Sequence, residues 1–573
     1  MKQIVFDIEA NGLDPDTVWC VIAYEREAKE YIEWSGDTLP NFKDWIAEQE
    51  ELEVIGHNII GYDIPVLEKL LNVDFSNCKV TDTLVMSRLA EPSRLGGHGL
   101  ENWGQLLHQP KGEHSDWLNF SQDMVEYCKQ DVRVNELVYQ RLLRDLRDFG
   151  TESVVLEGQV QRIISKQIEN GWLLNQRAAF NLLGELKEKK FDLEDKVHEK
   201  FKPLPTFIKE ITPKVKKDGT YSVVGLKFLG DQWEIAVAPF SRLDYPEFNL
   251  GSRQQIGRYL KYFGWVPETF TDKGQPIVDE GVLNKVKGIP EAELIGEYLM
   301  VQKRIAQIQS WVDAVKDNGR VHGYVNANGA VTGRMTHSSP NMGQVPAVYS
   351  PYGKECRAVW TVPSGYKLVG MDASGLELRM LAHYMNDGGY TNEILTGDIH
   401  TANQLAAGLA TRDQAKTFIY AFLYGAGDAK IGSIVGGTAK DGKRLKAKFL
   451  SNTPALGRLR ERVGVASGRG YVLGLDRRRV AVRSEHAALN TLLQSAGAIV
   501  MKKALQLLDE YATKWNIDYK IIGNIHDEIQ TEVQATEADV FGRLATSCIE
   551  AAGTYFGLNC PLAGEYKVGD TWA

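Results

Sequence analysis

The first residues that could do chemistry are four acids and a tyrosine within the first 131 positions. Asp7 and Glu9 lie two apart in IVFDIE, a predicted strand, so both carboxylates project from one face while the alternate residues face the core. Asp63 follows in HNIIGYD, a turn before a helical pattern, and Tyr127 and Asp131 lie four apart in MVEYCKQDV, on one helix face. Four carboxylates that converge on one point repel each other unless divalent cations neutralise them, and hard oxygen ligands favour Mg²⁺ or Mn²⁺.

Two such ions, roughly 3.5–4 Å apart, can activate a water and stabilise a leaving oxygen, and the tyrosine hydroxyl could orient that water. Any one of these acids could instead be a surface acid of an acidic domain, but the ordered set is much more specific. It resembles the DEDD family of 3′→5′ exonucleases, in its tyrosine-bearing subgroup, over about residues 1–150. The resemblance implies metal binding by Asp7, Glu9, Asp63 and Asp131, with Tyr127 positioning water. Asp82, in TDTL, is a weaker candidate, for which helix capping is an equally good explanation.

Two further acids lie far apart in the sequence but at the ends of predicted strands. In YKLVGMDASGLELRMLAH an apolar strand runs into Asp372 shortly before a helix, and in YKIIGNIHDEIQTEV two apolar strands flank His526-Asp527-Glu528, as in a tight hairpin. Asp372 and Asp527 could therefore meet at one sheet edge. Two Mg²⁺ ions there could bind a nucleoside triphosphate and the 3′-hydroxyl of a growing strand. Two unrelated turn acids are the alternative when these segments are considered alone.

The segment RDQAKTFIYAFLYG supplies the context for that pair of acids. Arg412, Lys416, Tyr420 and Tyr424 recur every four residues, so on an α-helix they form one stripe. The two cations could hold phosphates while the two rings pack on sugar and base. An amphipathic helix with a solvated basic edge explains the cations equally well, but it does not explain two tyrosines on the same stripe. The stripe therefore indicates a nucleotide-binding face.

Together these segments resemble motifs A, B and C of family A DNA polymerases, in wording most like the short phage replicative branch. The resemblance implies that Asp372 and Asp527 are the catalytic metal-binding pair, that Ala373 lends its backbone carbonyl, and that Glu377 rejects a ribose 2′-hydroxyl. It implies further contacts with the incoming nucleotide: the triphosphate with Arg412, Lys416 and His400, the sugar with Tyr420, and the nascent base pair with Tyr424. Most cellular members carry Phe at the Tyr420 position, and the family pattern with Tyr implies tolerance of dideoxynucleotides.

Other segments extend the resemblance over nearly the whole chain. TGRMTHSSPNMGQVP and EHAALNTLLQSAGA resemble segments of the family that contact DNA. They imply primer-template or minor-groove contacts by Arg334, Asn341, His486, Asn490 and Gln494, and His526 would face the primer terminus. The resemblance also implies two Mg²⁺ ions at each of the two sites, with Mn²⁺ able to replace them. Gly437 to Lys443 matches G-x-x-x-x-G-K, but Arg444 follows in place of Ser or Thr, so we expect a basic loop there and not a P-loop.

The elements that position these residues predict a multidomain chain. Strands and helices alternate to about residue 150, as in a small α/β domain, and an α+β part follows. Residues 151–200 and 252–316 have helical patterns, 201–247 suggests an insertion with a hairpin, helices are expected from about 376 to 425, and helix 485–515 precedes a hairpin near 519–533. The family resemblance implies a ribonuclease H-like exonuclease domain at 1–150, followed by a right hand. Its parts would be a thumb at 151–320, a palm at 321–390 and 484–573, and fingers at 391–483.

Charge is distributed unevenly along the 573 residues. The net charge of −9, taken alone, argues against a nucleic-acid partner. Residues 1–150, however, hold 14 basic and 28 acidic residues, whereas 412–483 hold 16 basic and five acidic ones. None of the six cysteines forms a C-x-x-C pair, no apolar run approaches the roughly 20 residues that span a bilayer, and acids interrupt the first apolar stretch. We therefore expect separate modules in a reducing, cytoplasmic setting, without a membrane association.

The sequence favours a template-directed DNA polymerase with 3′→5′ proofreading over three alternatives. These are a single-subunit RNA polymerase, a processive nuclease whose C-terminal part only grips DNA, and a polymerase with vestigial proofreading. The expected partners are primer-template DNA and deoxynucleoside triphosphates, with a helicase-primase and a single-strand binding protein as replisome candidates. Thioredoxin is not expected, because the insertion at 201–247 is short. A 5′-nuclease module is not expected, because the first motif begins at residue 7. Many members of the family end a few residues later with a histidine, whereas this sequence stops at Trp572-Ala573, so the resemblance does not extend to that terminal contact.

Overall fold

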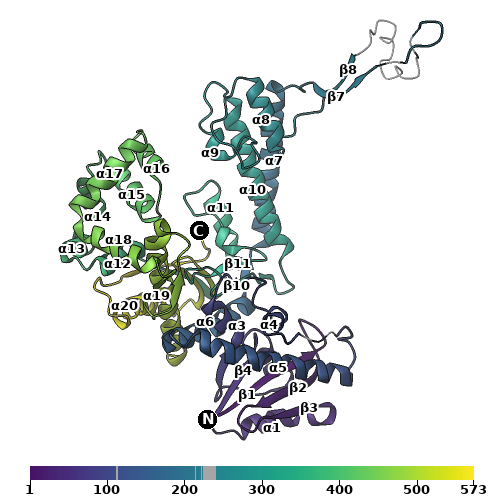
Figure 1. The fold of residues 1–573 in the computed structure, drawn as a ribbon, viewed down its shortest axis with the longest axis vertical. Coiled ribbons are helices and arrows are strands. Elements are labelled where there is room, and N and C mark those ends of the chain that lie inside the picture. Colours follow the sequence, from purple (N-terminus) through teal and green to yellow (C-terminus); the bar gives the residue numbers. More distant parts are fainter. Residues whose placement is uncertain (111, 113, 213, 221, 223–239) are drawn as a thin grey trace. The chain divides into compact units, whose positions relative to one another are not determined.

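The computed structural model describes the 573-residue chain except for residues 111, 113, 213, 221 and 223–239 (Figure 1). The chain forms two compact units. The first comprises Met1–Leu174, Ala314–Ala347 and Trp360–Ala573, and the second comprises Asn175–Asp313 and Val348–Val359. These limits differ from the predicted range 151–320, because residues 151–174 belong to the first unit and 348–359 join the second. All six cysteines are free, and among the described residues no helix has both the length and the apolar composition needed to cross a membrane.

The N-terminal part of the first unit is a five-stranded mixed sheet in the order β3-β2-β1-β4-β5. The central strand β1 pairs antiparallel with β2 and parallel with β4. Its alternation buries Phe6 and Ile8 in one apolar cluster and Val5 in another, so the sheet has a core on both faces. The strands are β1 (Lys2–Ala10), β2 (Val18–Glu25), β3 (Glu30–Ser35), β4 (Leu52–Gly56) and β5 (Lys79–Asp82).

Helices cover both faces of this sheet, as the predicted α/β pattern requires. The long helix α5 contacts both β1 and β2 and lies across them in Figure 1. It begins after Ser121, whose hydroxyl accepts the Met124 N–H as an N-cap, and it buries Val125, Cys128 and Val132 against the sheet. The helices of this part are α1 (Asn41–Ala47), α2 (Asp63–Leu71), α3 (Thr83–Ala90), α4 (Leu100–Leu106) and α5 (Gln122–Asp145).

A second sheet, antiparallel and four-stranded, lies in the C-terminal part of the first unit, in the order β16-β17-β13-β18. Its strands are β13 (Tyr366–Ala373), β16 (Tyr519–Ile525), β17 (Glu528–Gln534) and β18 (Gly564–Gly569), and it packs with α19 (Ala488–Lys514) and α20 (Ala538–Tyr555) in one large core. The predicted helix at 485–515 and the predicted hairpin near 519–533 are both confirmed. Shorter elements of this unit are β6 (Trp172–Leu174), β9 (Arg320–Val321), β10 (Tyr324–Asn326), β11 (Thr336–Ser338), η4 (Met342–Gln344) and β12 (Trp360–Thr361).

Helices fill the chain between β13 and α19. The predicted helical stretch 376–425 is confirmed by four helices, whereas the basic loop predicted at 437–443 is wrong from Ala439 onward. There Thr438 and Asp441 form a capping box that starts a 14-residue helix despite the glycines before it. The elements are α12 (Leu376–Met385), α13 (Gly388–Thr396), α14 (Ile399–Ala407), α15 (Arg412–Leu423), α16 (Asp428–Ser433), α17 (Ala439–Asn452), α18 (Pro454–Ser467), β14 (Tyr471–Leu473), β15 (Arg479–Ala481) and η5 (Glu485–Ala487).

The second unit is mainly helical, with α7 packed along α10. The continuous helical pattern predicted for 151–200 is interrupted at Gly171, whose φ of +62° ends α6 (Thr151–Asn170) before β6. Within the predicted insertion 201–247, β7 and β8 form an antiparallel pair. The β-rich segments YSVVGLKFL (221–229) and WEIAVAPF (233–240), on which the predicted hairpin rests, lie almost entirely outside the described residues. The elements are α7 (Gln176–Lys200), β7 (Thr206–Ile211), β8 (Phe240–Asp244), α8 (Arg253–Tyr262), α9 (Glu280–Leu283), α10 (Glu291–Asp313) and α11 (Gly353–Ala358).

A buried ionic cluster joins three distant segments of the first unit. Glu157 of α6 accepts from Arg478 Nη1 at 2.5 Å and from Lys502 Nζ at 2.6 and 2.9 Å, and Arg478 also pairs with Asp476 at 2.6 Å. The four side chains are at most 3% exposed. Two cations and two anions thus balance one another, which is the condition under which charges can be buried without a large desolvation cost.

We expect Glu157→Ala to lower the free energy of unfolding by about 3–5 kcal/mol, because it leaves two buried cations without their shared acceptor. The midpoint of urea denaturation measures this change. The matched control is Glu169→Ala, an exposed acid on the same helix, which should change stability by less than about 0.5 kcal/mol. Equal losses in the two variants would show that the cluster does not stabilise this unit.

Candidate active sites

Asp372 and Asp527 lie at the same edge of the C-terminal sheet. Asp372 is in β13, directly opposite Glu528 of β17, and Asp527 precedes Glu528 in the two-residue turn of the β16–β17 hairpin. His526, the other turn residue, has a φ of +57°, as the first position of a tight hairpin of this hand requires. The register therefore brings together two acids that are 155 positions apart in the sequence. Ala373, the next residue of β13, is buried and pairs with Gly564.

Glu528, together with Glu565 directly opposite Asp372 on β18, makes this edge a group of four acids, and the Glu528 side chain is held by neighbours. Its carboxylate accepts from Trp572 Nε1 at 2.7 Å and from the side-chain amide of Gln530. Trp572 is itself buried and packs against Trp172, with ring centroids 4.6 Å apart. The C-terminal tryptophan therefore orients an acid next to the pair of interest.

Burial raises the pKa values of both Asp372 and Asp527. Desolvation, followed by the charges of Asp527 and Glu528, raises the pKa of Asp372 to about 6, although this side chain still meets solvent. Burial also raises the pKa of Asp527, while Arg334 and His526 oppose that shift. Such a carboxylate group is costly to ionise without a counter-charge, and its hard oxygen donors suit a divalent cation.

Arg334 lies between this edge and the first turn of α12. Its Nη2 atom is 3.5 Å from Glu377 Oε1 and 3.9 Å from Asp527 Oδ1. Tyr424, the C-cap residue of α15, donates its hydroxyl to Glu377, with oxygen separations of 2.7 and 2.9 Å. Glu377 is thus shared by a cation and a phenol at the mouth of the acidic edge. A cavity of about 70 Å³ beside it is lined by Arg334, His526 and Asp527, among others.

Helix α15 presents the predicted stripe to solvent. Ala415, Phe418, Ile419, Phe422 and Leu423 form its buried face, whereas Arg412, Lys416 and Tyr424 are exposed and Tyr420 is half-buried. Arg412 binds Asp398, the N-cap of α14, through Nε at 2.6 Å and Nη2 at 3.2 Å. His400 lies beside Tyr420, with ring centroids 6.4 Å apart, and burial together with Arg412 and Lys416 lowers its pKa. His400 therefore shares one face of the α14–α15 pair with the four side chains of the stripe.

The remaining predicted DNA contacts lie around these elements. Asn490 and Gln494 are one turn apart on α19 and are both half-buried, and His486 is exposed in η5 just before that helix. A Cβ on Gly425 would lie 2.6 Å from the His486 carbonyl oxygen, so the end of α15 touches η5. Asn341 precedes η4, in the segment that follows β11.

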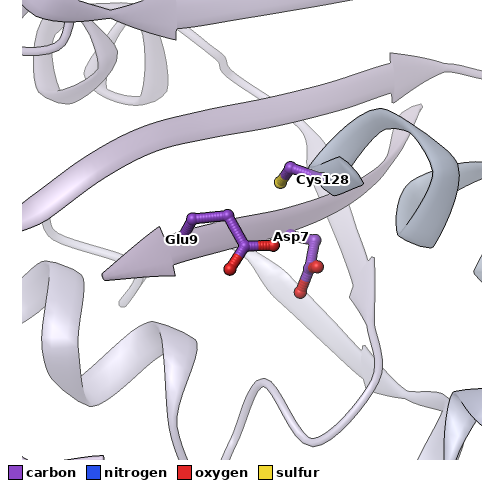
Figure 2. A group of neighbouring side chains, drawn as sticks. All are labelled: Asp7, Glu9 and Cys128. Atoms are coloured by element: carbon purple, nitrogen blue, oxygen red, sulfur yellow. The ribbon is translucent and has the colours of Figure 1, made fainter. Parts of the chain in front are cut away.

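A second group of acids lies on the N-terminal sheet. Asp7 and Glu9 project from the same face of β1, and Figure 2 shows their carboxylates close together, with Cys128 on a helix beside them. Asp63, the first residue of α2, accepts the Ile8 N–H at 3.2 Å and is hydrogen-bonded to Asp7. Burial and the charge of Asp82 raise the pKa of Asp63 to about 7. This arrangement, like the first, favours a bound cation.

The structure places the other predicted residues of this group on α5 and α3. Asp131 is buried on α5, one turn after Cys128, and Tyr127 is half-buried against Trp117 at a centroid distance of 5.5 Å. Among the described residues, the group whose ligand atoms all lie within 4.8 Å of one another is Asp7, Glu9 and Cys128, without Asp63 or Asp131. Asp82 is the N-cap of α3 and accepts hydrogen bonds from the Leu84, Asn58 and Ile60 N–H groups. Helix capping, the alternative considered for this residue, is therefore observed.

Three residues at these sites were not selected from the sequence. Cys128 lies inside the segment MVEYCKQDV, three positions before Asp131, but a cysteine in an amphipathic helix usually belongs to the core. Glu528 was part of the HDE segment without a role. Tyr62, which precedes Asp63, donates to the Gly12 carbonyl, and burial with Asp63, Glu9 and Asp7 raises its pKa to about 12. The positions of Cys128 and Glu528 next to the predicted site residues could have drawn attention to them in the sequence.

We expect Asp372→Asn to stabilise the fold by about 1 kcal/mol at pH 8, a value discounted because this carboxylate is partly screened by solvent. The pKa of Asp372 is raised in the folded state, so its ionisation destabilises the fold as pH rises through about 4 to 6. The gain in thermal midpoint should therefore shrink at pH 5. Asp317→Asn, at an exposed turn, serves as the control. A gain that grows on acidification would contradict the assigned repulsion.

Comparisons with known proteins agree on one family. A family model described as DNA polymerase family A matches residues 230–573. The chain is 37% identical to the DNA-directed DNA polymerase of Escherichia phage T7 and 36% identical to that of Enterobacteria phage T3, with 100% of this chain and 99–100% of each relative covered. The thermostable DNA polymerase I of Thermus aquaticus is 28% identical over 58% of this chain and 42% of its own length.

A solved structure extends the likeness to the fold. The POL domain of Pol1 from M. smegmatis, in complex with DNA primer-template and dNTP, has a TM-score of 0.77 at 18% identity, over 99% of this chain and 95% of that one. At that identity the match concerns the fold alone. The matched family model spans more than half of the chain, and the two phage relatives match it from end to end. The chain therefore belongs to DNA polymerase family A.

Proposed function

We propose that this protein is a template-directed DNA polymerase that adds deoxynucleotides to a primer 3′ end and removes misplaced ones by 3′→5′ hydrolysis. The observation that supports extension best is the meeting of Asp372 and Asp527 at one sheet edge, which Arg334 and Glu377 link to Tyr424 at the end of α15. The names of the phage relatives and the primer-template and dNTP in the M. smegmatis complex support the same substrates. A helicase-primase and a single-strand binding protein are the proposed replisome partners, and thioredoxin is not among them.

The oxygen donors at both sites fit Mg²⁺, or Mn²⁺ in its place, and we propose two ions at each site. The fit rests on the donor chemistry, because carboxylate oxygens gather at one point and hard oxygen donors suit these ions. When bound, such ions lower the pKa of an attacking hydroxyl or water and stabilise the leaving oxygen. At the sheet edge, the carboxylates of Asp372 and Asp527 and the backbone carbonyl of Ala373 would hold these ions.

The side chains around the edge have distinct proposed tasks. Arg412, Lys416 and His400 bind the triphosphate, because charge-assisted hydrogen bonds to phosphate oxygens are stronger than neutral ones. Tyr420 packs against the sugar, Tyr424 lies beside the nascent base pair, and Glu377 excludes a ribose 2′-hydroxyl from the position in front of it. The hydrogen bond from Tyr424 fixes the Glu377 carboxylate, so an added hydroxyl meets a carboxylate whose orientation is already set.

The DNA is held by residues on both sides of that edge. Arg334 and Asn341 contact the primer-template, His526 faces the primer terminus, and His486, Asn490 and Gln494 read the minor groove. Asn490 and Gln494 suit this task because amide groups can donate to and accept from base edges in the minor groove. Their place one turn apart on α19 gives them a common direction.

Proofreading is assigned to the N-terminal sheet. We propose that residues 1–150 form a ribonuclease H-like exonuclease domain in which Asp7, Glu9, Asp63 and Asp131 hold the metal ions and Tyr127 orients the water. The convergence of Asp7, Glu9 and Asp63 supports this assignment. The right hand then comprises a thumb at 151–320 with its insertion at 201–247, a palm at 321–390 and 484–573, and fingers at 391–483.

Primer extension from a mismatched 3′ end tests both activities at once. We expect Asp372→Ala to reduce extension by about 100-fold or more while shortening of the primer continues. Asp7→Ala should reduce shortening to a similar degree while extension continues, because each variant loses a carboxylate of one site only. Products resolved by length, with Mg²⁺ present, give both rates from one gel. Extension that survives in Asp372→Ala would refute the polymerase site, and nuclease activity that survives in Asp7→Ala would refute the proofreading site. A preference for ribonucleotides would point to an RNA polymerase.

Tyr420→Phe should raise discrimination against dideoxynucleotides by roughly 10- to 100-fold, because the phenolic hydroxyl can replace a hydrogen bond that the missing 3′-hydroxyl would make. The ratio of incorporation rates for deoxy- and dideoxynucleotides measures the effect. The matched control is Tyr390→Phe, which removes a hydroxyl of α13 that accepts a hydrogen bond from the Asn403 side chain of α14. An unchanged ratio in Tyr420→Phe would remove the role given to this hydroxyl.

A further inference from the structure

The side chain of Glu528 is held beside the two proposed catalytic acids by hydrogen bonds. Glu528 is directly opposite Asp372 in the sheet and next to Asp527 in the chain. Its Oε1 atom accepts from Trp572 Nε1 at 2.7 Å and from the side-chain amide of Gln530. Two donors on one oxygen restrict the rotation of a carboxylate, and hydrogen bonds to an ionised acceptor are stronger than neutral ones. The orientation of Glu528 is therefore set by neighbours outside the catalytic pair.

The indole of Trp572 has little freedom to move. The residue is 5% exposed, its ring packs against Trp172 at a centroid distance of 4.6 Å, and its backbone N–H donates to the Trp360 carbonyl at 3.2 Å. Trp172 occupies space that strand β16 leaves open, because a Cβ on Gly523 would collide with the Trp172 ring. A buried indole usually gives its N–H to an acceptor, and here the packing directs that N–H to Glu528.

Gln530, the second donor, lies across strand β13. It is directly opposite Gly370 in the register, and a Cβ on Gly370 would collide with the Gln530 amide. Gly370 and Gly523, on two different strands, thus leave room for the side chains that place both donors on Glu528. Filling the core would not require this arrangement, since apolar residues of the right volume could occupy the same space.

We propose that Trp572 is a positioning residue of the polymerase site: its indole N–H holds the Glu528 carboxylate in the orientation that nucleotide addition requires. The inference rests on the proposed polymerase site, because Trp572 acts through Glu528, beside Asp372 and Asp527. Catalysis of phosphoryl transfer is mainly electrostatic, so a carboxylate that turns away changes the field where the attacking and leaving oxygens are held. The chemical step should slow more than nucleotide binding weakens.

The alternative is that Trp572 only fills the core. Its packing against Trp172 explains its burial, and any ring of similar size would then serve. The two explanations differ for Trp572→Phe, which keeps an aromatic ring but lacks the N–H. A loss of packing alone lowers the fraction of folded, active protein, whereas a loss of positioning lowers the rate at which each active molecule adds a nucleotide.

The test is single-turnover addition of one deoxynucleotide to a paired primer by the full-length protein in Mg²⁺. In Trp572→Phe we expect the maximal rate to fall about 10- to 100-fold, the range typical of hydrogen-bond partners behind a metal site, while the half-saturating nucleotide concentration changes little. Trp360→Phe, a buried ring of the same cluster, is the matched control and should keep the wild-type rate. Trp572→Leu also lacks the N–H and should match Trp572→Phe in rate.

A double-mutant cycle tests whether Trp572 acts through Glu528. Glu528→Gln should itself slow nucleotide addition, and in that background Trp572→Phe should cause no further loss of rate. Equal losses in both backgrounds would show that the indole acts elsewhere and would overturn the inference. Because the rates describe active molecules only, a general loss of stability does not affect the comparison.

A measurement without turnover follows the contact itself. In protein labelled with ¹⁵N-tryptophan, the indole N–H signal that is absent from Trp572→Phe belongs to Trp572. It should shift in Glu528→Gln, because an amide is a weaker acceptor than a carboxylate. It should stay in place in Glu565→Gln, which changes the acid on the other side of Asp372. A signal that ignores both changes would contradict the hydrogen bond.

The outcomes separate this inference from the proposed function. An unchanged rate in Trp572→Phe, in a protein that extends primers and loses extension in Asp372→Ala, overturns the positioning role and leaves the polymerase site intact. A rate that falls equally in Trp360→Phe assigns the effect to packing and overturns it too. A wild-type protein that does not extend primers refutes the proposed function and, with it, the role of Trp572, even if the indole signal depends on Glu528.

Discussion

Repulsion among gathered carboxylates is the constraint on which the rest of this structure depends. Asp372 faces Glu528 on β17 and Glu565 on β18, and Asp527 adjoins them, so four acids share one sheet edge. Like charges placed directly opposite in a sheet destabilise it, and the raised pKa of Asp372 is the electrostatic sign of that cost. Burial of the hydrophobic core around β13, β17, α19 and α20 offsets it. Arg334 and the donors from Trp572 and Gln530 then fix where the charges lie.

The N-terminal sheet meets the same constraint with a different arrangement. Asp7 and Glu9 belong to the central strand, which has an apolar cluster on each face, so neither acid can retreat far into solvent. Asp63 reaches them from the start of α2, where the helix N-terminus favours a negative charge. Covering helix α5 brings Cys128 against the same acids. A sheet that is covered by apolar clusters on both faces therefore holds these acids close together.

Local spacing was enough to group most of the candidate site residues, and contacts distant in sequence were not predictable. The period of two in β1 and of four along 412–424 are properties of a strand and a helix, so those side chains could be grouped from the sequence. The cluster of Glu157, Arg478 and Lys502 joins residues more than 300 positions apart, and no local pattern encodes such a pairing. The helix at Ala439–Asn452 was missed for another reason: glycines before it outweighed the Thr438–Asp441 capping box.

The solvent exposure of an ion pair decides whether it stabilises the fold or can be replaced by a contact with a ligand. Arg412 and Asp398 form a two-point ion pair, but their side chains are 51% and 42% exposed, and such surface pairs contribute little to stability. A triphosphate offers more charge to the same guanidinium, so it can displace Asp398 at little cost. The buried Glu157 cluster has no such competitor, because removing one partner strands a desolvated charge. The proposed nucleotide binding would therefore rearrange the face of α15 while the sheet that carries Asp372 keeps its geometry.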